Sequence, residues 1–477
     1  MGTSFISFVS NLIAGLMNAS LTASGWGQEV TNTGTITGPA PLAVFFDGTA
    51  TTSTIGFNTW REAGYHWDFG YTTPSTPGIW SVSGQNKGNE VGRRPLAAHV
   101  YETPGTYTAS VRAQLPSGTY QDKFITVVVE DPETYWTTSG RSTVTIGSGD
   151  PMPTWADNTR YLFQRGVDYS AKSVTAINSR LNICLAATGS GAKPIMPALT
   201  LESVSWTTRT WSSNVIFDNL NLMAGFEQAL PCAHVMLCKC ETKNMVWGSE
   251  IDWRWIEGPS ATQPAGWYRS KFTTQYECTH DALDAASSYA MFTKSNRHAV
   301  LGCAFKNSSF HNVRSGGFYK LFFAHNQCFN AGENVSSTTF RSMGVSTTYA
   351  DWENTVAYGT ASRYLVAGYN SIGSAADTSS NAAMTIQPSN EASSAGIEDV
   401  IADSNTNARA SGGGWSAVAR RVTVAENAFA SYSPDTTPGS AATPAEWFGP
   451  YYTNNVTADG VLIFAAPTKI SPAKAGT

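Results

Sequence analysis

Charged residues are scarce in this sequence. Asp, Glu, Lys and Arg make up only 14% of its 477 residues, whereas an average soluble domain has about 25%. The net charge of −5 is mildly acidic, which gives no reason to expect a nucleic-acid partner. Gly, Ser, Thr and Asn fill the surface instead, a composition typical of β-rich extracellular or virion proteins.

Several enzyme motifs are also absent. The sequence contains no G-x-S-x-G, P-loop or H-E-x-x-H motif, so esterase, nucleotide-binding and zinc-protease functions have no support. Its seven cysteines all lie between Cys184 and Cys328. Their odd number argues against a complete disulfide framework. The sequence Cys238-Lys239-Cys240 lacks partners at zinc spacing, and no Asp cluster for calcium recurs. We predict no metal and no cofactor.

No Lys or Arg precedes Arg61. Residues 5–17 (FISFVSNLIAGLM) are apolar enough for a signal peptide but lack its basic start, and they are too few to span a bilayer. The sequence begins with Met1, which favours an uncleaved attachment segment over an export signal. An uncleaved N-terminus on a protein with an extracellular composition is typical of a virion component.

Seven short apolar runs recur with one internal layout. They are VIFDNL (215–220), VMLCKC (235–240), VLGCAF (300–305), LFFAHN (321–326), LVAGYN (365–370), VIADSN (400–405) and VTVAEN (422–427). Most of the gaps between their starts are near multiples of about 21 or 22 residues, the length of one coil of a parallel β-helix. The 35-residue gap requires an expanded coil, and MTIQPSN (384–390) is a candidate strand within it. The runs are too short and too β-branched for helices.

Two positions within these runs carry further predictions. Asn326, Asn370, Asn405 and Asn427 share one offset, which predicts a stack of Asn side chains at a coil corner. Cys238 and Cys303 share another offset, which predicts two stacked, buried thiols that behave as small hydrophobes.

Residues 34–131 have the strand and turn pattern of a small β-sandwich. The segments LAVFFDG (42–48), YHWDFG (65–70), HVYETPGTYTASVRA (99–113) and KFITVVVED (123–131) supply its strands. In order and spacing they resemble the PKD domain. The resemblance implies a non-catalytic spacer or adhesion module. The sequence departs from that family after Gly70, where Tyr71 begins an insertion that extends to about Arg94.

The segment RYLFQRGVDY (160–169), followed by AATGSGAKPIM (186–196), resembles the entry of right-handed parallel β-helix proteins of the pectate-lyase-like and phage-tailspike-like kind. This resemblance implies a fold and not an activity, because the fold carries lyases, hydrolases, epimerases and pure binders. We therefore predict an all-β protein, in which an Ig-like, PKD-like β-sandwich precedes a right-handed parallel β-helix.

The longest insertion, between Cys240 and Val300, is the candidate site because excursions from a solenoid often carry function. Flat aromatic rings stack on sugar rings, and the candidate glycan-binding residues are Trp253, Arg254, Trp255, Trp267 and Tyr268. Paired carboxylates can cleave a glycosidic bond, and the candidate catalytic residues are Glu250, Asp252, Asp281 and Asp284. The alternative is structural, with the tryptophans packed on a coil and the aspartates in turns. His311 and His325, beside core strands, are more typical of structural histidines.

We divide the chain into an attachment segment (1–33), the sandwich (34–131), a linker and β-helix entry (132–172), the β-helix (173–431) and a C-terminal cap or tail (432–477). The favoured function is a phage virion spike or fibre that recognises host cell-surface polysaccharide, with or without depolymerase activity. We expect the N-terminal segment to bind other virion proteins, the spike to be a homotrimer, and no membrane span. Alternatives are a secreted bacterial polysaccharide lyase or glycoside hydrolase with a PKD accessory domain, and a non-catalytic capsid or tail decoration protein.

Overall fold

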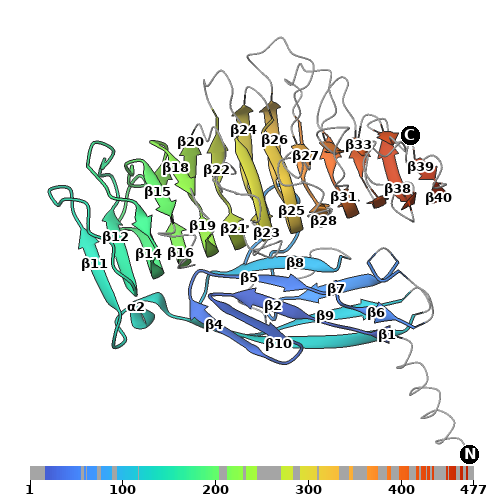
Figure 1. Ribbon diagram of the computed structural model, residues 1–477, viewed down its shortest axis with the longest axis horizontal. Coiled ribbons are helices and arrows are strands. Elements are labelled where there is room, and N and C mark those ends of the chain that lie inside the picture. The colour runs from blue at the N-terminus through green and yellow to red at the C-terminus, as the bar shows by residue number, and fades with distance from the viewer. Residues whose placement is uncertain are drawn as a thin grey trace, which may run out of the picture. The chain divides into compact units, whose positions relative to one another are not determined.

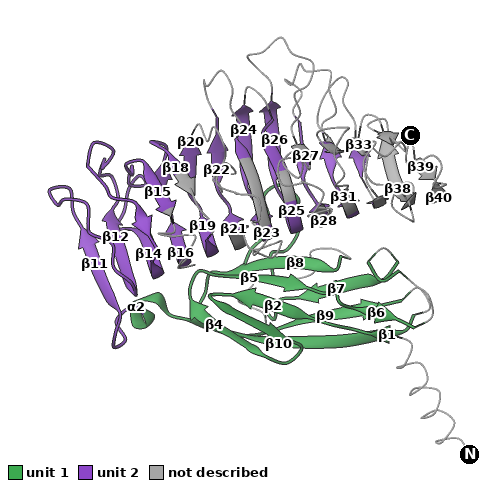
Figure 2. Cartoon of the chain, in the orientation of Figure 1, with its two compact units in different colours: residues 1–135 green, residues 136–477 purple. Residues whose placement is uncertain are grey.

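The structure is a computed structural model with two compact units, residues 1–135 and 136–477 (Figure 2). The residues that it describes are 17–54, 58–60, 62–71, 77–88, 94–115, 118–202, 212–228, 232–243, 270–282, 290–308, 311–331, 343–346, 362–373, 384–387, 397–407, 415–417, 420–425, 427–429, 432–434, 447–448, 451–457, 462–465 and 469–470. Among them, no helix is long and apolar enough to cross a membrane.

The first unit is a sandwich of two four-stranded sheets (Figure 1). One sheet has the order β3 (Gln28–Thr31), β2 (Thr22–Gly25), β5 (Leu42–Asp47) and β8 (Leu96–Tyr101). The other has the order β4 (Thr35–Pro39), β10 (Tyr120–Glu130), β9 (Gly105–Gln114) and β7 (Gly64–Asp68). A short pair, β1 (Met17–Asn18) and β6 (Thr52–Ser53), lies outside both sheets. Strands β2 and β3 lie within residues 1–33.

Alternation of apolar and polar residues forms the sandwich core, because successive side chains on a strand point to opposite faces. In β9, Tyr107, Ala109, Val111 and Ala113 are buried, and the residues between them are more exposed. Gly70 ends the strand segment WDFG with a φ of +79°, and a Cβ there would lie 2.6 Å from the Thr108 backbone. Only glycine therefore fits this turn.

Tyr71, the first residue of the insertion, packs back onto the sandwich. Its ring lies 5.8 Å from Tyr101 and 4.9 Å from Tyr107, and its hydroxyl is 2.8 Å from Nε2 of the buried His99. His99 also stacks on Phe69 with ring centroids 4.5 Å apart. The departure from the PKD pattern thus begins with a residue that completes the aromatic core.

The second unit is a parallel β-helix. Most of its coils contribute up to three strands, and equivalent strands of successive coils pair in parallel (Figure 1). The first strands of the coils make one long sheet, here called face A. They are β11 (Ser142–Ile146), β12 (Thr159–Gln164), β14 (Leu181–Thr188), β16 (Ser213–Asp218), β19 (Ala233–Cys238), β21 (Ser270–Tyr276), the C-terminal parts of β23 (Met291–Leu301) and β25 (Val313–Ala324), β28 (Ser362–Gly368), β31 (Ile397–Asp403) and β34 (Arg420–Ala425).

A second row of short strands, face B, follows one corner after face A. It contains β17 (Asn221–Leu222), β20 (Glu241–Lys243), β22 (Thr279–Asp281), β24 (Ala304–Ser308), β26 (Gln327–Ala331), β29 (Ser371–Ile372), β32 (Thr406–Asn407) and β35 (Ala428–Phe429). The third row comprises β13 (Ile177–Asn178), β15 (Leu199–Glu202), β18 (Phe226–Gln228), the N-terminal parts of β23 and β25, β27 (Met343–Ser346), β30 (Met384–Gln387), β33 (Trp415–Ala417) and β36 (Tyr432–Pro434).

Short elements join or follow these rows. Helix α2 (Pro132–Tyr135) ends the first unit. At the other end of the chain, β38 (Tyr451–Thr457) pairs in parallel with β34 and antiparallel with β39 (Leu462–Ala465). A separate pair consists of β37 (Trp447–Phe448) and β40 (Lys469–Ile470). The antiparallel partner β39 interrupts the parallel stacking of the coils and pairs an edge that would otherwise stay open.

The register confirms the repeat and corrects its period. Six of the seven runs begin at equivalent positions of their coils. The strand pairs Val215–Val235, Leu321–Leu365, Leu365–Val400 and Val400–Val422 show this directly. Two further coils, paired at Thr273 and His298, connect Val235 to Leu321. The run VLGCAF was placed wrongly, because the residue level with Val235 and Leu321 is His298. A coil at residues 273–278 was missed, since its inward positions are the polar Thr273 and Gln275. The 44 residues between Leu321 and Leu365 form one coil, not two.

The predicted Asn stack is confirmed. The Oδ1 of Asn370 accepts hydrogen bonds from the backbone N–H (2.9 Å) and the side-chain amide (3.1 Å) of Asn326. The Oδ1 of Asn405 accepts the same two hydrogen bonds from Asn370, and the Oδ1 of Asn427 accepts them from Asn405. Each amide nitrogen also donates to a carbonyl of the preceding coil, as Asn370 does to Phe323 at 3.0 Å. All four side chains are buried.

Thiols extend this column toward the N-terminus. The pairings place Leu220, Cys240, Cys278 and Cys303 at the corner position that the four asparagines occupy in later coils. Cys240 donates to the Phe217 carbonyl and Cys278 to that of Leu237, the positions equivalent to the acceptors of the Asn amides. The prediction that Cys238 stacks with Cys303 was therefore wrong; Cys240 and Cys278 share its column. All seven cysteines are free.

We expect Asn370→Ala to lower the free energy of unfolding by roughly 3 kcal/mol, because several buried donors and acceptors lose their partner at once. Asn370→Cys should cost less, since a thiol can donate to the same Phe323 carbonyl as the thiols of earlier coils do. Denaturant unfolding of the full chain measures both. Asn330→Gly, which removes a partly exposed amide and keeps the positive φ of 55°, is the control. Equal losses for all three variants would contradict the structural importance of the column.

The sandwich should lose stability in acid through His99. Burial, with the charge of Lys87 adding to it, lowers the pKa of His99 to about 3, whereas an unfolded His titrates near 6.5. The unfolded state therefore binds the proton first, so stability is full above pH 6.5 and falls by about 1.4 kcal/mol per pH unit below it. His99→Gln should flatten this slope between pH 6.5 and 4.5. Hydrogen exchange of β5 and β8 peptides, corrected for the intrinsic rate, measures it; parallel slopes for the two proteins would refute the assignment.

Candidate functional site

Most residues of the predicted site lie outside the described part of the chain. These are Glu250, Asp252, Trp253, Arg254, Trp255, Trp267, Tyr268 and Asp284. Asp281 alone is described, at the end of β22. Its Oδ2 lies 3.2 Å from the Lys306 ammonium, and its Oδ1 accepts a hydrogen bond of 2.9 Å from Asn307. This carboxylate is held between two side chains of the next coil, an arrangement that fits a structural anchor as well as a site residue.

The structure does bring together the points at which the predicted site segments leave the β-helix. Strand β20 ends at Lys243, directly before residues 244–269, and β22 ends at Asp281, just before residues 283–289. Lys243 and Asp281 are direct neighbours in face B, and Asp281 is the neighbour of Lys306 in turn. The excursions that carry Glu250, Asp252 and Asp284 therefore begin on adjacent coils at one edge of face B.

Polar side chains line face B beside these points. Asn330 donates a hydrogen bond of 3.1 Å to Asn307, which continues the Asp281–Asn307 contact into a third coil. One coil before Asp281, Glu241 pairs with Lys193 at 2.9 Å. These residues are partly exposed and alternate along the strands with inward residues such as His280 and Phe305. The edge that bears the predicted site is thus polar, with both charges present.

A second surface lies where each coil enters face A, and sequence reasoning missed it. We call it the entry row; its members are His234, Phe272, Arg297, Lys320, Tyr364 and Asp399. Every member has a positive φ, from 53° to 67°, and falls at the residue that the strand pairings skip. The equivalent residues of earlier coils, Asn158, Asn182 and Asn214, have the same conformation.

This backbone conformation explains why the entry row forms. A left-handed residue interrupts the ladder and turns its side chain away from the alternation of the strand. In the early coils Asn fills the position, as is common for left-handed backbone: Asn214 donates to Asn182, and Asn182 to Asn158, each at 2.7 Å. In later coils larger side chains take the same place, so the hydrogen-bonded stack becomes a stack of rings and charges.

The contacts within the entry row are aromatic and cationic. His234 stacks on Phe272 with centroids 4.5 Å apart, and the Arg297 guanidinium lies 5.1 Å from the Phe272 ring. Burial lowers the pKa of His234 to about 4, so its imidazole is neutral at physiological pH and stacks as a flat ring. Farther along, the Lys320 ammonium lies 5.7 Å from the Tyr364 ring. Such cation–π contacts order long side chains that would otherwise be mobile.

Two residues beside the row complete this surface. Arg363 contacts the carboxylate of Asp399 at 2.8 Å and 3.2 Å, and its guanidinium lies 4.8 Å from the Tyr364 ring. Tyr319 packs edge-on against Tyr364 at 5.7 Å. Asp399 is nearly buried, whereas Arg363 and both tyrosines are partly exposed. These four residues present rings, hydroxyls, a guanidinium and a carboxylate on three successive coils.

The signal for the entry row was present in the sequence. Each member directly precedes the first inward residue of its coil, as Tyr364 precedes Leu365 and Lys320 precedes Leu321. This column lies just outside the apolar runs, so the repeat within the runs does not include it. His325, named as an alternative site residue, is buried and stacks on Tyr369 at 5.1 Å, the packing expected of a structural histidine.

One group of side chains among the described residues could hold a metal. It consists of Cys278, His280 and Cys303, all buried, with ligand atoms within 4.8 Å of one another. No metal was predicted from the sequence, in which His280 lies outside the seven apolar runs. The group lies on the inner side of the coils, and His280 directly precedes Asp281 in β22.

No protein-family model matches the chain, and no curated protein matches it. Two solved structures are similar in part. The crystal structure of PfbA, a surface adhesin of Streptococcus pneumoniae, aligns with a TM-score of 0.39 and 10% identity over 71% of this chain and 94% of that chain. The catalytic domain of a GH87 alpha-1,3-glucanase in complex with nigerose aligns with a TM-score of 0.26 and 10% identity, over 95% and 86%. At these values neither comparison carries an argument about function.

Proposed function

We propose that this chain is a glycan-recognition spike or fibre of a phage virion, with the β-helix as its binding domain and host cell-surface polysaccharide as its ligand. The observation that carries this proposal is the entry row with Tyr319 and Arg363. Each coil contributes one residue to the row, several of these residues are partly exposed rings or cations, and successive coils are about 4.8 Å apart. An extended polymer can therefore contact several coils in turn.

The chemistry of the row fits a carbohydrate. Tyrosine combines a flat apolar ring with a hydroxyl that can bond to a sugar. The Arg363–Asp399 pair fixes the guanidinium in one orientation, so less side-chain entropy is lost when a ligand binds. The rings are also packed against one another before binding. A preorganised surface of this kind suits recognition of a repeating ligand better than the active-site cleft of an enzyme for small molecules.

The remaining parts of the proposal come from the sequence. The PKD-like sandwich acts as a spacer, the apolar N-terminal segment attaches the spike to other virion proteins, and three copies assemble into a homotrimer. The low charge content, 14% of the residues, supports a place outside the cell such as a virion surface. Antibody labelling of purified phage particles tests this placement, and particles without the protein would contradict it.

The entry row should govern affinity. We expect Tyr364→Asn and Phe272→Asn each to weaken binding of host capsular polysaccharide or lipopolysaccharide at least tenfold, about 1.4 kcal/mol, because each removes a stacking ring. Asn occupies the equivalent position in earlier coils, so the positive φ is tolerated. Tyr369→Asn is the matched control, since Tyr369 also has a positive φ (56°) but lies at the other end of β28. Calorimetry measures the affinities; equal losses in all three variants would reject the row as the binding surface.

A depolymerase is the second candidate, favoured by the adjacent origins of the excursions that carry Glu250, Asp252 and Asp284. In that case the wild-type protein shortens the polysaccharide, as gel filtration would show, and Glu250→Gln or Asp284→Asn abolishes shortening without abolishing binding. Asp281→Asn should retain activity if Asp281 serves as the anchor its contacts indicate. Binding without shortening leaves a recognition spike. Neither binding nor shortening contradicts both functions and favours a decoration protein.

A further inference from the structure

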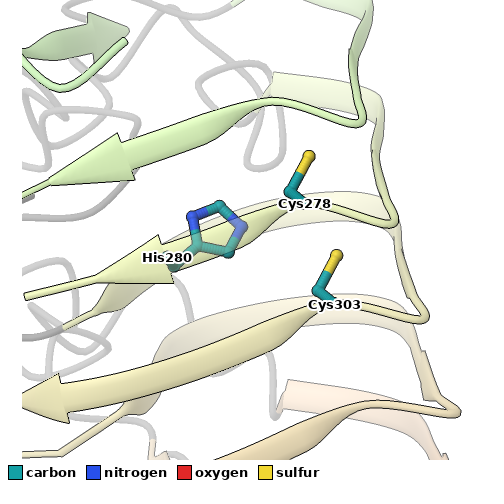
Figure 3. Close-up of side chains that lie close together, drawn as sticks. All are labelled: Cys278, His280 and Cys303. Atoms are coloured by element: carbon teal, nitrogen blue, oxygen red, sulfur yellow. The ribbon is translucent and has the colours of Figure 1, made fainter. Parts of the chain in front are cut away.

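Three potential metal ligands meet inside the β-helix on two successive coils. Cys278 and His280 belong to the corner and the face B strand β22 of one coil, and Cys303 stands at the corner before β24 of the next. Their ligand atoms lie within 4.8 Å of one another and all three residues are buried. Figure 3 shows the imidazole of His280 on the same side of the coils as the two thiols, with one ring nitrogen facing them.

The imidazole is held in the orientation that a metal ligand needs. Its Nδ1 lies 2.8 Å from the hydroxyl of Thr242 in the preceding coil, and its ring stacks on Phe305 in the next, with centroids 4.6 Å apart and planes 5° from parallel. When the Thr242 hydroxyl accepts this bond from Nδ1–H, the other nitrogen carries the lone pair that can bind a metal. Thr242 and Phe305 thus fix both the rotation and the position of the ring.

The second ring nitrogen of His280, Nε2, provides the observation that favours a bound ligand. His280 is fully buried, and its Nε2 has no hydrogen-bond partner among the described residues. A buried polar atom without a partner costs free energy, and native structures rarely leave one unexplained. The two thiols beside it make long contacts to backbone carbonyls, 3.4 Å from Cys278 to Leu237 and 3.5 Å from Cys303 to Leu301, and they hydrogen-bond to each other. These weak bonds use the thiol protons, which metal binding would release, so both sulfur atoms can serve as ligands.

We propose that Cys278, His280 and Cys303 bind a thiophilic divalent cation, Zn²⁺, that joins two coils of the β-helix. Two thiolates and a neutral imidazole around Zn²⁺ sum to zero charge, so the site would place no net charge in the core. Thiolate and imidazole are the ligands that zinc prefers, at about 2.0 to 2.3 Å. Ligand atoms already within 4.8 Å of one another need only small shifts to reach those distances. Cu⁺ also prefers thiolates, but with the same ligands it would leave a net negative charge in the core.

The bound ion would link two successive coils in the region where the longest insertions leave the β-helix. His280 directly precedes Asp281, and residues 283–289 follow two positions later. Because the ligands come from two coils, they meet only when β22 stacks on β24. Zinc binding is then coupled to folding of this region, and binding releases the two thiol protons. With no disulfide among the cysteines, a metal is the remaining means of cross-linking these coils.

The test uses the full chain, refolded in parallel with Zn²⁺, with Cu⁺ under reducing conditions, and with a chelator. After passage over a chelating resin, elemental analysis should find about one zinc per chain in the wild type. Two variants remove ligands with residues that the neighbouring coil already carries at that position: His280→Phe, as at Phe305, and Cys303→Asn, as at Asn326. Both should lose the zinc and keep the β-sheet circular dichroism. Cys184→Ala, which removes a buried thiol elsewhere, should retain it.

Two further readouts separate a metal site from packing. Co²⁺ in place of zinc should give a thiolate charge-transfer absorption in the wild type that both ligand variants lack. Zinc should also raise the apparent Tm of the wild type and not that of the variants, because only a ligand that binds the folded state stabilises it. Zinc-free wild type, or equal zinc in His280→Phe and Cys303→Asn, would overturn the proposal. Retention of Cu⁺ but not Zn²⁺ would overturn the choice of a divalent ion.

Discussion

The β-helix depends on one constraint, namely that each coil must satisfy the buried hydrogen-bonding groups of the coil before it. At the corner after face A, the chain turns inside the core, where water cannot reach the backbone N–H groups and carbonyls. The amide of Asn370 meets this demand by accepting from the N–H of Asn326 and donating to the carbonyl of Phe323. A residue at this corner is therefore selected for its hydrogen bonds as much as for its size.

The same constraint explains the change from asparagine to cysteine along the column. Cys240 and Cys278 donate to the equivalent carbonyls at 3.3 and 3.4 Å, so a thiol can replace half of what an Asn amide does. A thiol cannot accept as well as an amide oxygen, and the thiols of this column hydrogen-bond to one another instead. Metal binding by the thiols would offset the free energy that is lost through their weaker hydrogen bonds. A column that begins as structural packing can thereby acquire a metal-binding function without any change in the backbone.

The sequence predicted what depends on local pattern and failed where the coil length varies. Alternation identified the sandwich strands, and the apolar runs identified face A, because burial on one side determines both patterns. The Asn stack was also predicted, since all four residues share one offset. The coil at 273–278 was missed because Thr273 and Gln275 occupy inward positions that Val and Leu fill elsewhere. Once that coil was missed, the assumed period misaligned VLGCAF, and Cys238 was assigned to a column that contains Cys240. The predicted site residues, Asp281 among them, remain a prediction.

The positive-φ residues show how a repetitive fold obtains a specific surface. Regular stacking places equivalent residues in register, so any outward column becomes a continuous stripe without further design. In the early coils, Asn158, Asn182 and Asn214 make this stripe a chain of amides with no apolar surface. Later coils have Phe272, Lys320 and Tyr364 at the same backbone position. Their backbone is more strained than that of Asn, since bulky side chains rarely adopt a positive φ. Strain retained at the same position through successive coils points to a use for those side chains. Packing alone would be served as well by Asn, so under the proposed function it is the later coils, and not the early ones, that form the recognition surface.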